Sequence, residues 1–198
     1  HSLTMASGTN GGVFYMLAAA YSQLIPSVNP NMTINVEASA GTNENLALLS
    51  SYEADVSFAN PGDALSAYEG KREFESKAAT NLRAVMSGNM NYFHVMTLED
   101  SPIKTLEDIK GRKVSVGPTG APYIMPEIIE AATGFVVNED YTGEWMSHDQ
   151  AAEALINGDI DAICATNAIP SSAYSSLTAA HPDVVFISLT EQEINNVI

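Results

Sequence analysis

Residues 3–25 read LTMASGTNGGVFYMLAAAYSQLI, and this stretch decides the fold class. A short apolar strand pattern over residues 3–7 is followed by the small-residue run 8–12, and then by an amphipathic segment that ends before Pro26. A strand, a glycine-rich turn and a helix in this order form the repeating unit of α/β proteins with mainly parallel sheets. We therefore expect an α/β fold that begins with this unit.

The same order recurs along the rest of the chain. We predict further strands over residues 33–39, 55–60, 82–88, 92–98, 112–117, 159–166 and 184–189. Two segments, ENLALLSSYEADVSFAN (44–60) and AAEALINGDIDAICATN (151–167), share a helix, a polar break, an aspartate, an apolar strand and a final asparagine. This repeat favours two similar lobes, although any two αβ units share such features. We predict residues 1–90 as the first lobe and residues 91–198 as the second.

The charge balance limits the classes of partner. Eight basic residues against 24 acidic ones give a formal net charge of −16, which argues against binding to nucleic acid or to an anionic membrane. Hydrophobic residues make up 45% of the chain and charged residues only 16%, so we expect a folded protein rather than a disordered one. The first residues lack the pattern of a signal peptide, so we expect that a signal, if the protein is exported, has been removed.

Cysteine and histidine give no sign of a metal site or a catalytic site. The single cysteine, Cys164, excludes an internal disulfide and any site built from several cysteines, and its apolar strand predicts a buried thiol. His94, His148 and His181 are far apart and lie in no metal-binding arrangement; His148 is placed at a helix start. We therefore expect no catalytic residue, no metal and no cofactor.

Three loops of small residues follow predicted strands and open predicted helices. They are residues 8–12, 40–43 and 117–121. Ligands of open α/β proteins bind at the carboxyl ends of parallel strands, where helix N-termini offer backbone N–H groups and partial positive charge. An acidic protein can bind a carboxylate or a phosphate through such local donors. The dinucleotide and nucleoside-triphosphate fingerprints are absent from the sequence.

Several segments together resemble the TAXI family of periplasmic solute-binding proteins, the receptors of one branch of the TRAP transporters. They are GTNGGVFYMLAAAYSQLI (8–25), SAGTNENLALL (39–49), EADVSFAN (53–60), SPIKTLEDIKGRKVSVGPTG (101–120) and HDQAAEALINGDIDAICAT (148–166). The resemblance implies a type II periplasmic-binding-protein fold, with two α/β lobes and a ligand cleft between them. It also implies a periplasmic receptor, not an enzyme, that passes a small organic acid, such as glutamate, to TRAP membrane subunits driven by an ion gradient.

The resemblance assigns ligand-binding residues in both lobes. In the first lobe they are Thr9, Asn10, Gly11, Gly12, Val13, Tyr15, Ser39, Thr42, Asn45 and Asn60, and in the second His94, Thr119, Gly120, Ala121, Tyr123, Thr166 and Asn167. Two departures stand out. Residues 120–123 read Gly-Ala-Pro-Tyr where the family commonly has a Gly-Ser-Gly-Thr-like stretch, and Asn60-Pro61 replaces a glutamine followed by a polar residue. They imply an acid that is less polar than glutamate or differently shaped.

Two alternatives use the same bilobal architecture. One is a phosphoribosyltransferase-like enzyme, which would need basic residues around its phosphate sites, whereas all eight Lys and Arg residues fall outside the three loops in sequence. The other is a ligand-sensing module, whose sign would be a fused signalling domain. Members of the TAXI family continue past position 198 and fold back onto the first lobe, so we also expect the first lobe to lack a C-terminal segment. The crossings between the lobes, near residues 85–91 and after residue 189, are the expected hinge.

Overall fold

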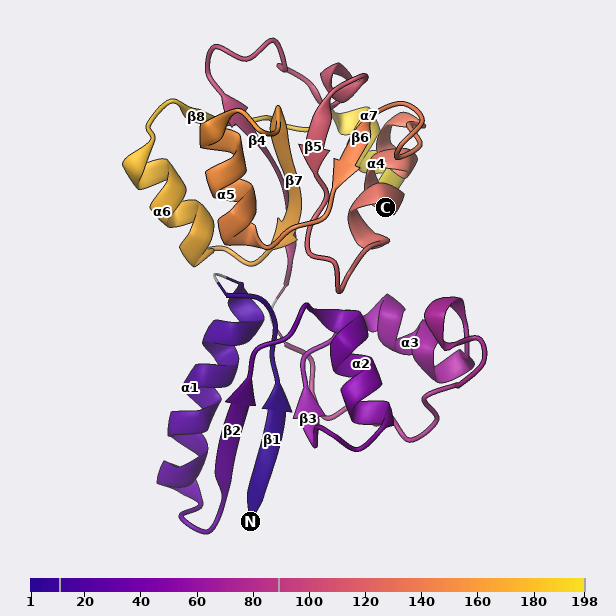
Figure 1. Cartoon of the computed structure of the whole chain (residues 1–198), viewed down its shortest axis with the longest axis vertical. Helices are drawn as coiled ribbons and strands as arrows, with labels where there is room; N and C mark the ends of the chain where they lie inside the picture. Colours follow the sequence, from indigo (N-terminus) through magenta and orange to yellow (C-terminus); the bar gives the residue numbers. More distant parts are fainter. Residues whose placement is uncertain (11, 89, 198) are drawn as a thin grey trace. The chain divides into compact units, whose positions relative to one another are not determined.

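A computed structural model describes residues 1–10, 12–88 and 90–197. The chain divides into two compact units, unit 1 (His1–Asn89) and unit 2 (Met90–Ile198), and each is described by itself (Figure 1). None of the described helices is both long enough and apolar enough to cross a membrane.

Unit 1 is a three-stranded parallel sheet with helices. Its elements are β1 (Ser2–Ala6), α1 (Val13–Val28), β2 (Thr33–Glu37), α2 (Thr42–Ser50), β3 (Val56–Ser57), α3 (Pro61–Glu69) and the 3-10 turn η1 (Arg72–Phe74). The strand order is β2-β1-β3, and β1 runs parallel to both neighbours. One small core lies under α1, around Met5, Ala18 and Ile34, and a second lies around Leu46 and Ala67 of α2 and α3.

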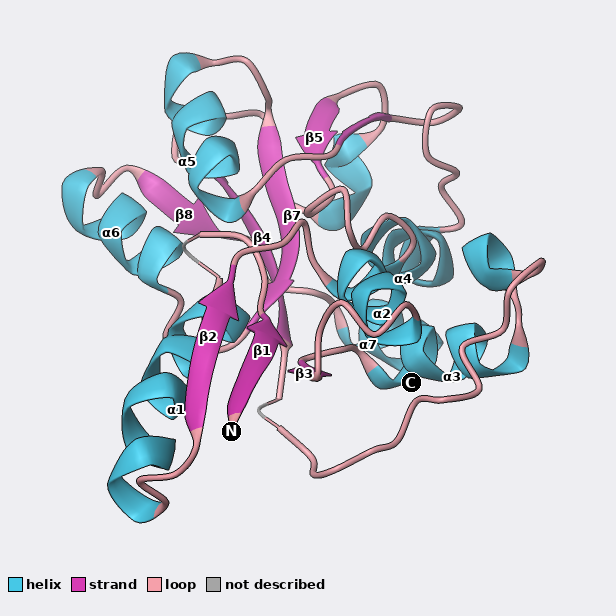
Figure 2. Cartoon of the chain, turned by 60° about the horizontal axis from the view of Figure 1, so that its bottom comes forward, coloured by secondary structure: helices cyan, strands magenta, loops and turns pink. Residues whose placement is uncertain are grey.

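Unit 2 is a five-stranded mixed sheet with helices on both faces (Figure 2). Its elements are β4 (Tyr92–Leu98), the 3-10 turn η2 (Leu106–Ile109), β5 (Lys113–Ser115), α4 (Ile124–Thr133), β6 (Thr142–Glu144), α5 (His148–Asn157), β7 (Ala162–Asn167), α6 (Ser172–Ala180), β8 (Val184–Phe186) and α7 (Glu191–Val197). The strand order is β6-β5-β7-β4-β8, with β4 antiparallel to both β7 and β8.

The two faces of the unit 2 sheet follow the two-residue period of its strands. Val95 of β4 and Cys164 of β7 belong to the core beneath α4, whereas their neighbours Met96 and Ile163 belong to the core beneath α5 and α6. The two layers of apolar packing give unit 2 a much larger core than unit 1. Cys164 is a buried free thiol, as predicted, and burial raises its pKa to about 12.

Helix signals in the sequence are confirmed in unit 2. Ser147 accepts a hydrogen bond from the Gln150 backbone N–H and forms a capping box at the start of α5, and Gly158 ends that helix in the left-handed conformation. The capping box of Thr105 and Asp108 opens η2 as expected. Hydrogen bonds from the backbone N–H groups of Lys104 and Thr105 lower the pKa of Asp108.

Two sequence predictions about local structure are wrong. Residues 82–88, predicted as a strand, have no regular secondary structure, and Val85 and Met86 are largely exposed. Helix α1 does not end before Pro26 but continues to Val28. A proline in the last turn removes a single backbone donor, while the N–H of Asn29 still bonds to Ile25 and closes the helix.

Beyond Leu189, where a return crossing is expected, residues 191–197 form α7. This helix packs on α4 within unit 2, and Asn196 Nδ2 donates to the carbonyl oxygen of Ala132 over 3.3 Å. Thr190 and Glu193 form a reciprocal cap at its start, with Thr190 donating to the Glu193 carboxylate through both its N–H and its hydroxyl. These last described residues therefore belong to unit 2.

Candidate ligand-binding site

The loops predicted to bind ligand in unit 1 lie at one edge of its sheet. Because β1, β2 and β3 run parallel, their carboxyl ends lie at the same edge, followed by residues 7–12, 38–41 and 58–60. Each of these loops leads into a helix, α1, α2 or α3. Gly41, at the start of α2, has a φ of +130°, a conformation that favours glycine.

Asn45 of α2 holds the three loops together from beneath. Its side chain is fully buried, and its Nδ2 donates to the carbonyl oxygens of Ser7 (2.7 Å) and Phe58 (2.8 Å). Its Oδ1 accepts a hydrogen bond from the Ser39 hydroxyl over 2.7 Å. One amide thus bonds to the loop after each of the three strands. In this structure Asn45 and Ser39 are positioning residues for the loops.

Thr42 and Asn60 join the starts of α2 and α3. The Thr42 hydroxyl oxygen accepts hydrogen bonds from Asn60 Nδ2 (3.0 Å) and from the Asn60 backbone N–H (3.3 Å). Thr42 is buried, and Asn60 is half-buried. Sequence reasoning placed both residues at the edge, and the structure brings them into contact there.

The loop between β1 and α1 carries the remaining predicted residues of unit 1. Gly12 is buried and precedes α1, whereas Gly11 lies outside the described residues. The other four are exposed or half-buried: Thr9, Asn10, Val13 and Tyr15. Tyr15 is 37% exposed, so its ring is available on the surface of α1 near the loop.

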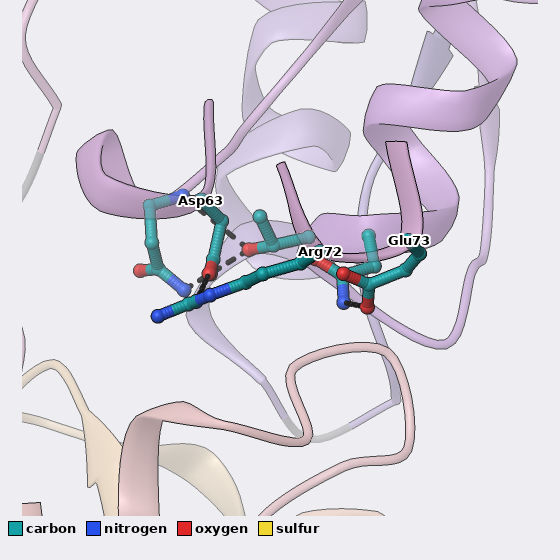
Figure 3. A network of polar contacts seen from close by, with 6 residues as sticks. Asp63, Arg72 and Glu73 are labelled. Carbon is teal, nitrogen blue, oxygen red and sulfur yellow. Dashed lines mark hydrogen bonds and ion pairs between the residues drawn. The ribbon is translucent and has the colours of Figure 1, made fainter. Parts of the chain in front are cut away.

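A charged pair at the same edge was missed by sequence reasoning. Arg72 Nη1 donates to Asp63 Oδ1 over 3.0 Å, and Asp63 is the third residue of α3 (Figure 3). The neighbouring Glu73 accepts a hydrogen bond from Nδ2 of Asn43, the second residue of α2. Arg72 is distant in sequence from every glycine-rich loop, so loop composition gave no signal for it.

In unit 2, the carboxyl ends of the parallel strands β5, β6 and β7 lie at one edge of the sheet. The amino end of the antiparallel strand β4 lies there as well, since Tyr92 pairs with Asn167. The loop after β5 turns at Gly117, whose φ is +89°, and Ala121 N–H bonds to the Pro118 carbonyl oxygen. Within this loop Thr119 is exposed, Ala121 half-buried and Gly120 buried.

Tyr123 stands directly before α4 and is 39% exposed. The preceding Pro122 accepts a hydrogen bond from Trp145 Nε1 over 3.1 Å, which anchors the end of the loop to the core beneath α4. The bulky ring noted in the sequence is thus at the surface beside the loop after β5.

At the end of β7, Asn167 is buried and its side chain is engaged within the unit. Its Nδ2 donates to the Ser171 hydroxyl over 3.0 Å, and its Oδ1 accepts from the Ala168 backbone N–H over 2.9 Å. Thr166, one residue earlier, is half-buried. Asn167 therefore shapes the turn into α6, while Thr166 remains the more accessible of the two predicted residues.

His94 packs against aromatic rings near this edge. Its ring lies 5.9 Å from the Tyr174 ring and 6.1 Å from the Phe186 ring, measured between centroids. Burial lowers its pKa, partly opposed by a hydrogen bond with the Asn167 backbone. His148 Nδ1 lies 2.7 Å from the Tyr174 hydroxyl, and burial, aided by nearby His94, lowers the His148 pKa to about 4. The two imidazoles thus flank one buried tyrosine.

No group of three or more His, Cys, Asp or Glu side chains that could hold a metal ion occurs in the described part of the chain. The aspartates that open β3 and β7 have structural roles. Asp55 accepts a hydrogen bond from Thr4 N–H and Asp161 from Lys113 N–H, each over 2.8 Å. These carboxylates join the start of one strand to its neighbour, at the edge opposite the loops.

The sequence pattern of the NMT1-like family matches residues 5–198. The chain belongs to this family. The matched residues extend through both units of the NMT1-like chain.

Solved structures similar to this NMT1-like chain are periplasmic or transporter-associated binding proteins. The aliphatic sulphonate binding protein SsuA of Escherichia coli is 18% identical, with a TM-score of 0.55 over 94% of this chain and 56% of its own. SsuA of Xanthomonas axonopodis bound to MOPS is also 18% identical, with a TM-score of 0.63 over 96% and 61%. ArtJ of Geobacillus stearothermophilus, which binds arginine, lysine and histidine, is 12% identical, with a TM-score of 0.64 over 97% and 78%.

These likenesses establish the fold. The NMT1-like chain has the α/β fold of type II periplasmic binding proteins, as the sequence resemblance implied. The chain spans 56% and 61% of the length of the two sulfonate-binding proteins. The solved neighbours are binding proteins rather than enzymes.

Proposed function

We propose that this protein is an extracytoplasmic receptor that binds a small organic acid without transforming it. The carrying observation is the buried Asn45, whose amide bonds to the loop after each strand of unit 1. A site whose loops are fixed before the ligand arrives loses less conformational entropy on binding. The fold shared with solute-binding proteins supports the same function.

The solute class follows from the chemistry of the loops at the strand ends of unit 1 and of unit 2. Small residues leave the backbone accessible, and helices α1, α2 and α4 begin directly after the loops. Helix N-termini favour negatively charged groups through their N–H donors and partial positive charge. Exposed Tyr123 adds an aromatic surface, which favours an acid less polar than glutamate. We propose that the edges of both units contribute to binding one solute.

We propose that the receptor delivers its solute to TRAP membrane subunits in the periplasm. The support is the ordered set of TAXI-like segments from residue 8 to residue 166. Solved neighbours from transporters of the ABC class share the fold, as the substrate binding protein of an amino acid ABC transporter does at 13% identity. The alternative delivery to an ABC transporter is tested by supplying the purified receptor to vesicles carrying either kind of membrane subunit.

We also propose residues 1–90 and 91–198 as two lobes, with the first completed by a strand outside the described residues. Among those residues, β3 pairs with β1 alone and leaves its other edge open. The apolar side chains of Val85 and Met86, which follow α3 in the sequence, are largely exposed. An open strand edge and exposed apolar residues together favour an additional strand.

A thermal-shift screen tests the receptor function. The purified chain is heated with amino acids, mono- and dicarboxylates, aromatic acids, alkanesulfonates, sugars, and ATP with phosphoribosyl pyrophosphate. A ligand at about 100 times its dissociation constant stabilises the native state by roughly 2.7 kcal/mol, which is readily measured. We expect stabilisation by one class of small acid.

The outcomes separate the alternatives. Stabilisation by phosphorylated compounds alone would favour the phosphoribosyltransferase-like enzyme, and stabilisation by no compound would count against a receptor. Repeating the screen with Tyr123→Thr tests the solute shape, because removal of the ring should shift preference toward more polar acids. An unchanged preference would show that Tyr123 does not contact the solute.

A further inference from the structure

We infer that Arg72 recognises the carboxylate of the solute and that Asp63 positions its guanidinium; this inference rests on the proposed receptor function. Neither residue belongs to the glycine-rich loops that the sequence singles out. The inference depends on where the fold of unit 1 brings them and on the charge that Arg72 carries there.

The position of Arg72 is fixed by hydrogen bonds to two helices. Its guanidinium bonds to Asp63 near the start of α3, and the next residue, Glu73, accepts from Asn43 near the start of α2 (Figure 3). Both helix starts follow strand ends at the loop edge of unit 1. Arg72 therefore lies near the Thr42–Asn60 contact, although its segment is far from Thr42 in the sequence.

The backbone of this segment is also held in a defined conformation. Arg72 has a φ of +54°, which is uncommon for a residue with a side chain. The N–H of Lys71, just before it, bonds to the Ser66 carbonyl oxygen, and that of Ala79 bonds to Ala67. The turn is thus attached to α3 on both sides of Arg72, so the guanidinium is presented by a rigid support.

The charges of the pair are unequally buried. The Asp63 side chain is 6% exposed, whereas the Arg72 side chain is 32% exposed. A guanidinium is planar and permanently charged, and its geometry matches that of a carboxylate. Because its side chain is partly exposed while that of Asp63 is buried, Arg72 is suited to meet a carboxylate that arrives from solvent.

The neighbouring cation Lys71 pairs with Glu69 of α3, and three further cations are engaged elsewhere in the chain. Lys110 pairs with Asp140 and Lys113 with Glu144, both in unit 2, while Arg83 donates to backbone carbonyl oxygens at residues 80 and 82. In a protein of net charge −16, a local positive group strengthens the attraction for an acid that the backbone donors provide. Arg72 supplies that group at the loop edge.

The test measures binding of matched acids and amides by calorimetry. The probes are glutamate and glutamine, succinate and succinamide, benzoate and benzamide, with methanesulfonate as the second kind of anion. We expect the unmodified protein to bind one carboxylate more tightly than its amide. Arg72→Gln should weaken the binding of that carboxylate about 10- to 100-fold, because a charge-assisted pair is lost. The affinity for the amide should be unchanged.

Three further variants separate recognition from stability. Arg72→Lys keeps the charge without the planar fork and should give an intermediate loss. Asp63→Asn leaves the Arg72 charge in place and should change carboxylate affinity far less than Arg72→Gln does. Lys77→Gln, an exposed cation in the same segment, is the matched control and should bind normally. If Arg72→Gln does not fold, Asp63→Asn/Arg72→Gln removes both charges together and should show the same loss.

Several results would overturn the inference. Arg72→Gln binding the carboxylate as tightly as the unmodified protein would reduce the pair to a structural ion pair. Equal binding of acid and amide, or preference for a neutral solute, would reject Arg72 as the recognition residue while the receptor function stands. Preference for methanesulfonate over every carboxylate would reject a carboxylate solute. Binding of no probe in this set or in the wider screen would overturn both proposals.

Discussion

The sheets of unit 1 and unit 2 contain the same arrangement of three strands. In β2-β1-β3 and in β6-β5-β7, the first strand of the chain is central and a helix precedes each neighbour. Unit 2 adds β4, antiparallel at the edge of β7, and then β8. Residues 82–88 follow α3 as β8 follows α6, yet they form no strand. Because β3 leaves one edge open among the described residues of unit 1, the comparison teaches that strand-like composition beside an open edge is not enough to form a strand.

The repeat in the sequence has a physical counterpart in both units. The carboxylates of Asp55, before β3, and Asp161, before β7, each accept a hydrogen bond from a backbone N–H of the central strand, at Thr4 and Lys113. Each aspartate also donates its own backbone N–H to the carbonyl oxygen of the same residue. The units differ in core size, because unit 2 has apolar layers on both faces of its sheet. We therefore expect unit 2 to be the more stable, and the single tryptophan, Trp145, reports on it alone.

The largest effect is expected from core truncations that compare the two units. Ile129→Ala in unit 2 and Leu46→Ala in unit 1 each remove a side chain that is at most 1% exposed, and each should cost about 2–5 kcal/mol. Urea unfolding is followed by Trp145 fluorescence and by circular dichroism. Ile129→Ala should shift the fluorescence midpoint, whereas Leu46→Ala should shift an earlier part of the circular dichroism transition. Equal shifts of the fluorescence midpoint would mean that the units unfold together.

Acid should destabilise unit 2 through His148. Its pKa is lowered to about 4 in the folded protein, so below the ordinary value near 6.5 the unfolded chain binds the proton more readily. Stability is thus complete above pH 6.5 and is lost as the pH falls toward 4, by about 3 kcal/mol in all. The lowered pKa of His94 acts in the same direction.

The pH dependence is measured by Trp145 fluorescence in urea from pH 7.5 to pH 4. His148→Asn keeps an acceptor near the Tyr174 hydroxyl but cannot be protonated, so its stability should depend less on pH. His181→Asn, at the end of α6, is the matched control. A slope that is the same in all three proteins would show that His148 does not govern the acid response.

The smallest effect compares the two aspartates. Asp161→Ala should cost about 2 kcal/mol, because it removes a carboxylate that accepts a backbone N–H at a half-buried position. Asp55→Ala should cost about 1 kcal/mol or less, because Asp55 is exposed and water replaces its contact. Both are read from urea midpoints. A larger cost for Asp55→Ala would contradict the view that unit 2 depends more on this contact.

Much of the fold could be predicted from local patterns, because helix caps and strand periodicity depend on neighbouring residues. Ser147 and Gly158 set the ends of α5 in this way. One error arose where the outcome depends on tertiary pairing: residues 82–88 have strand-like composition, yet they do not pair with the open edge of β3. The error at Pro26 is local, because the last turn of a helix tolerates a proline.

The candidate site shows the same division. Glycine-rich loops were found from sequence because turns need small residues, and the structure places the loops of each unit at the carboxyl ends of its parallel strands. The buried hydrogen bonds of Asn45, and the arrival of Arg72 beside α2 and α3, depend on tertiary folding. No local pattern distinguishes an arginine that pairs with Asp63 from one on an ordinary surface.

Chemical modification of the buried Cys164 thiol can report how often unit 2 opens. The thiolate is the form that reacts, and burial holds the pKa of this thiol at about 12, so alkylating and oxidising reagents find almost nothing to attack in the folded state. Cys164 lies in the centre of β7, and its side chain belongs to the core beneath α4. The rate at which a reagent modifies this thiol therefore measures how often unit 2 opens, and the folded chain presents no thiol to oxidants.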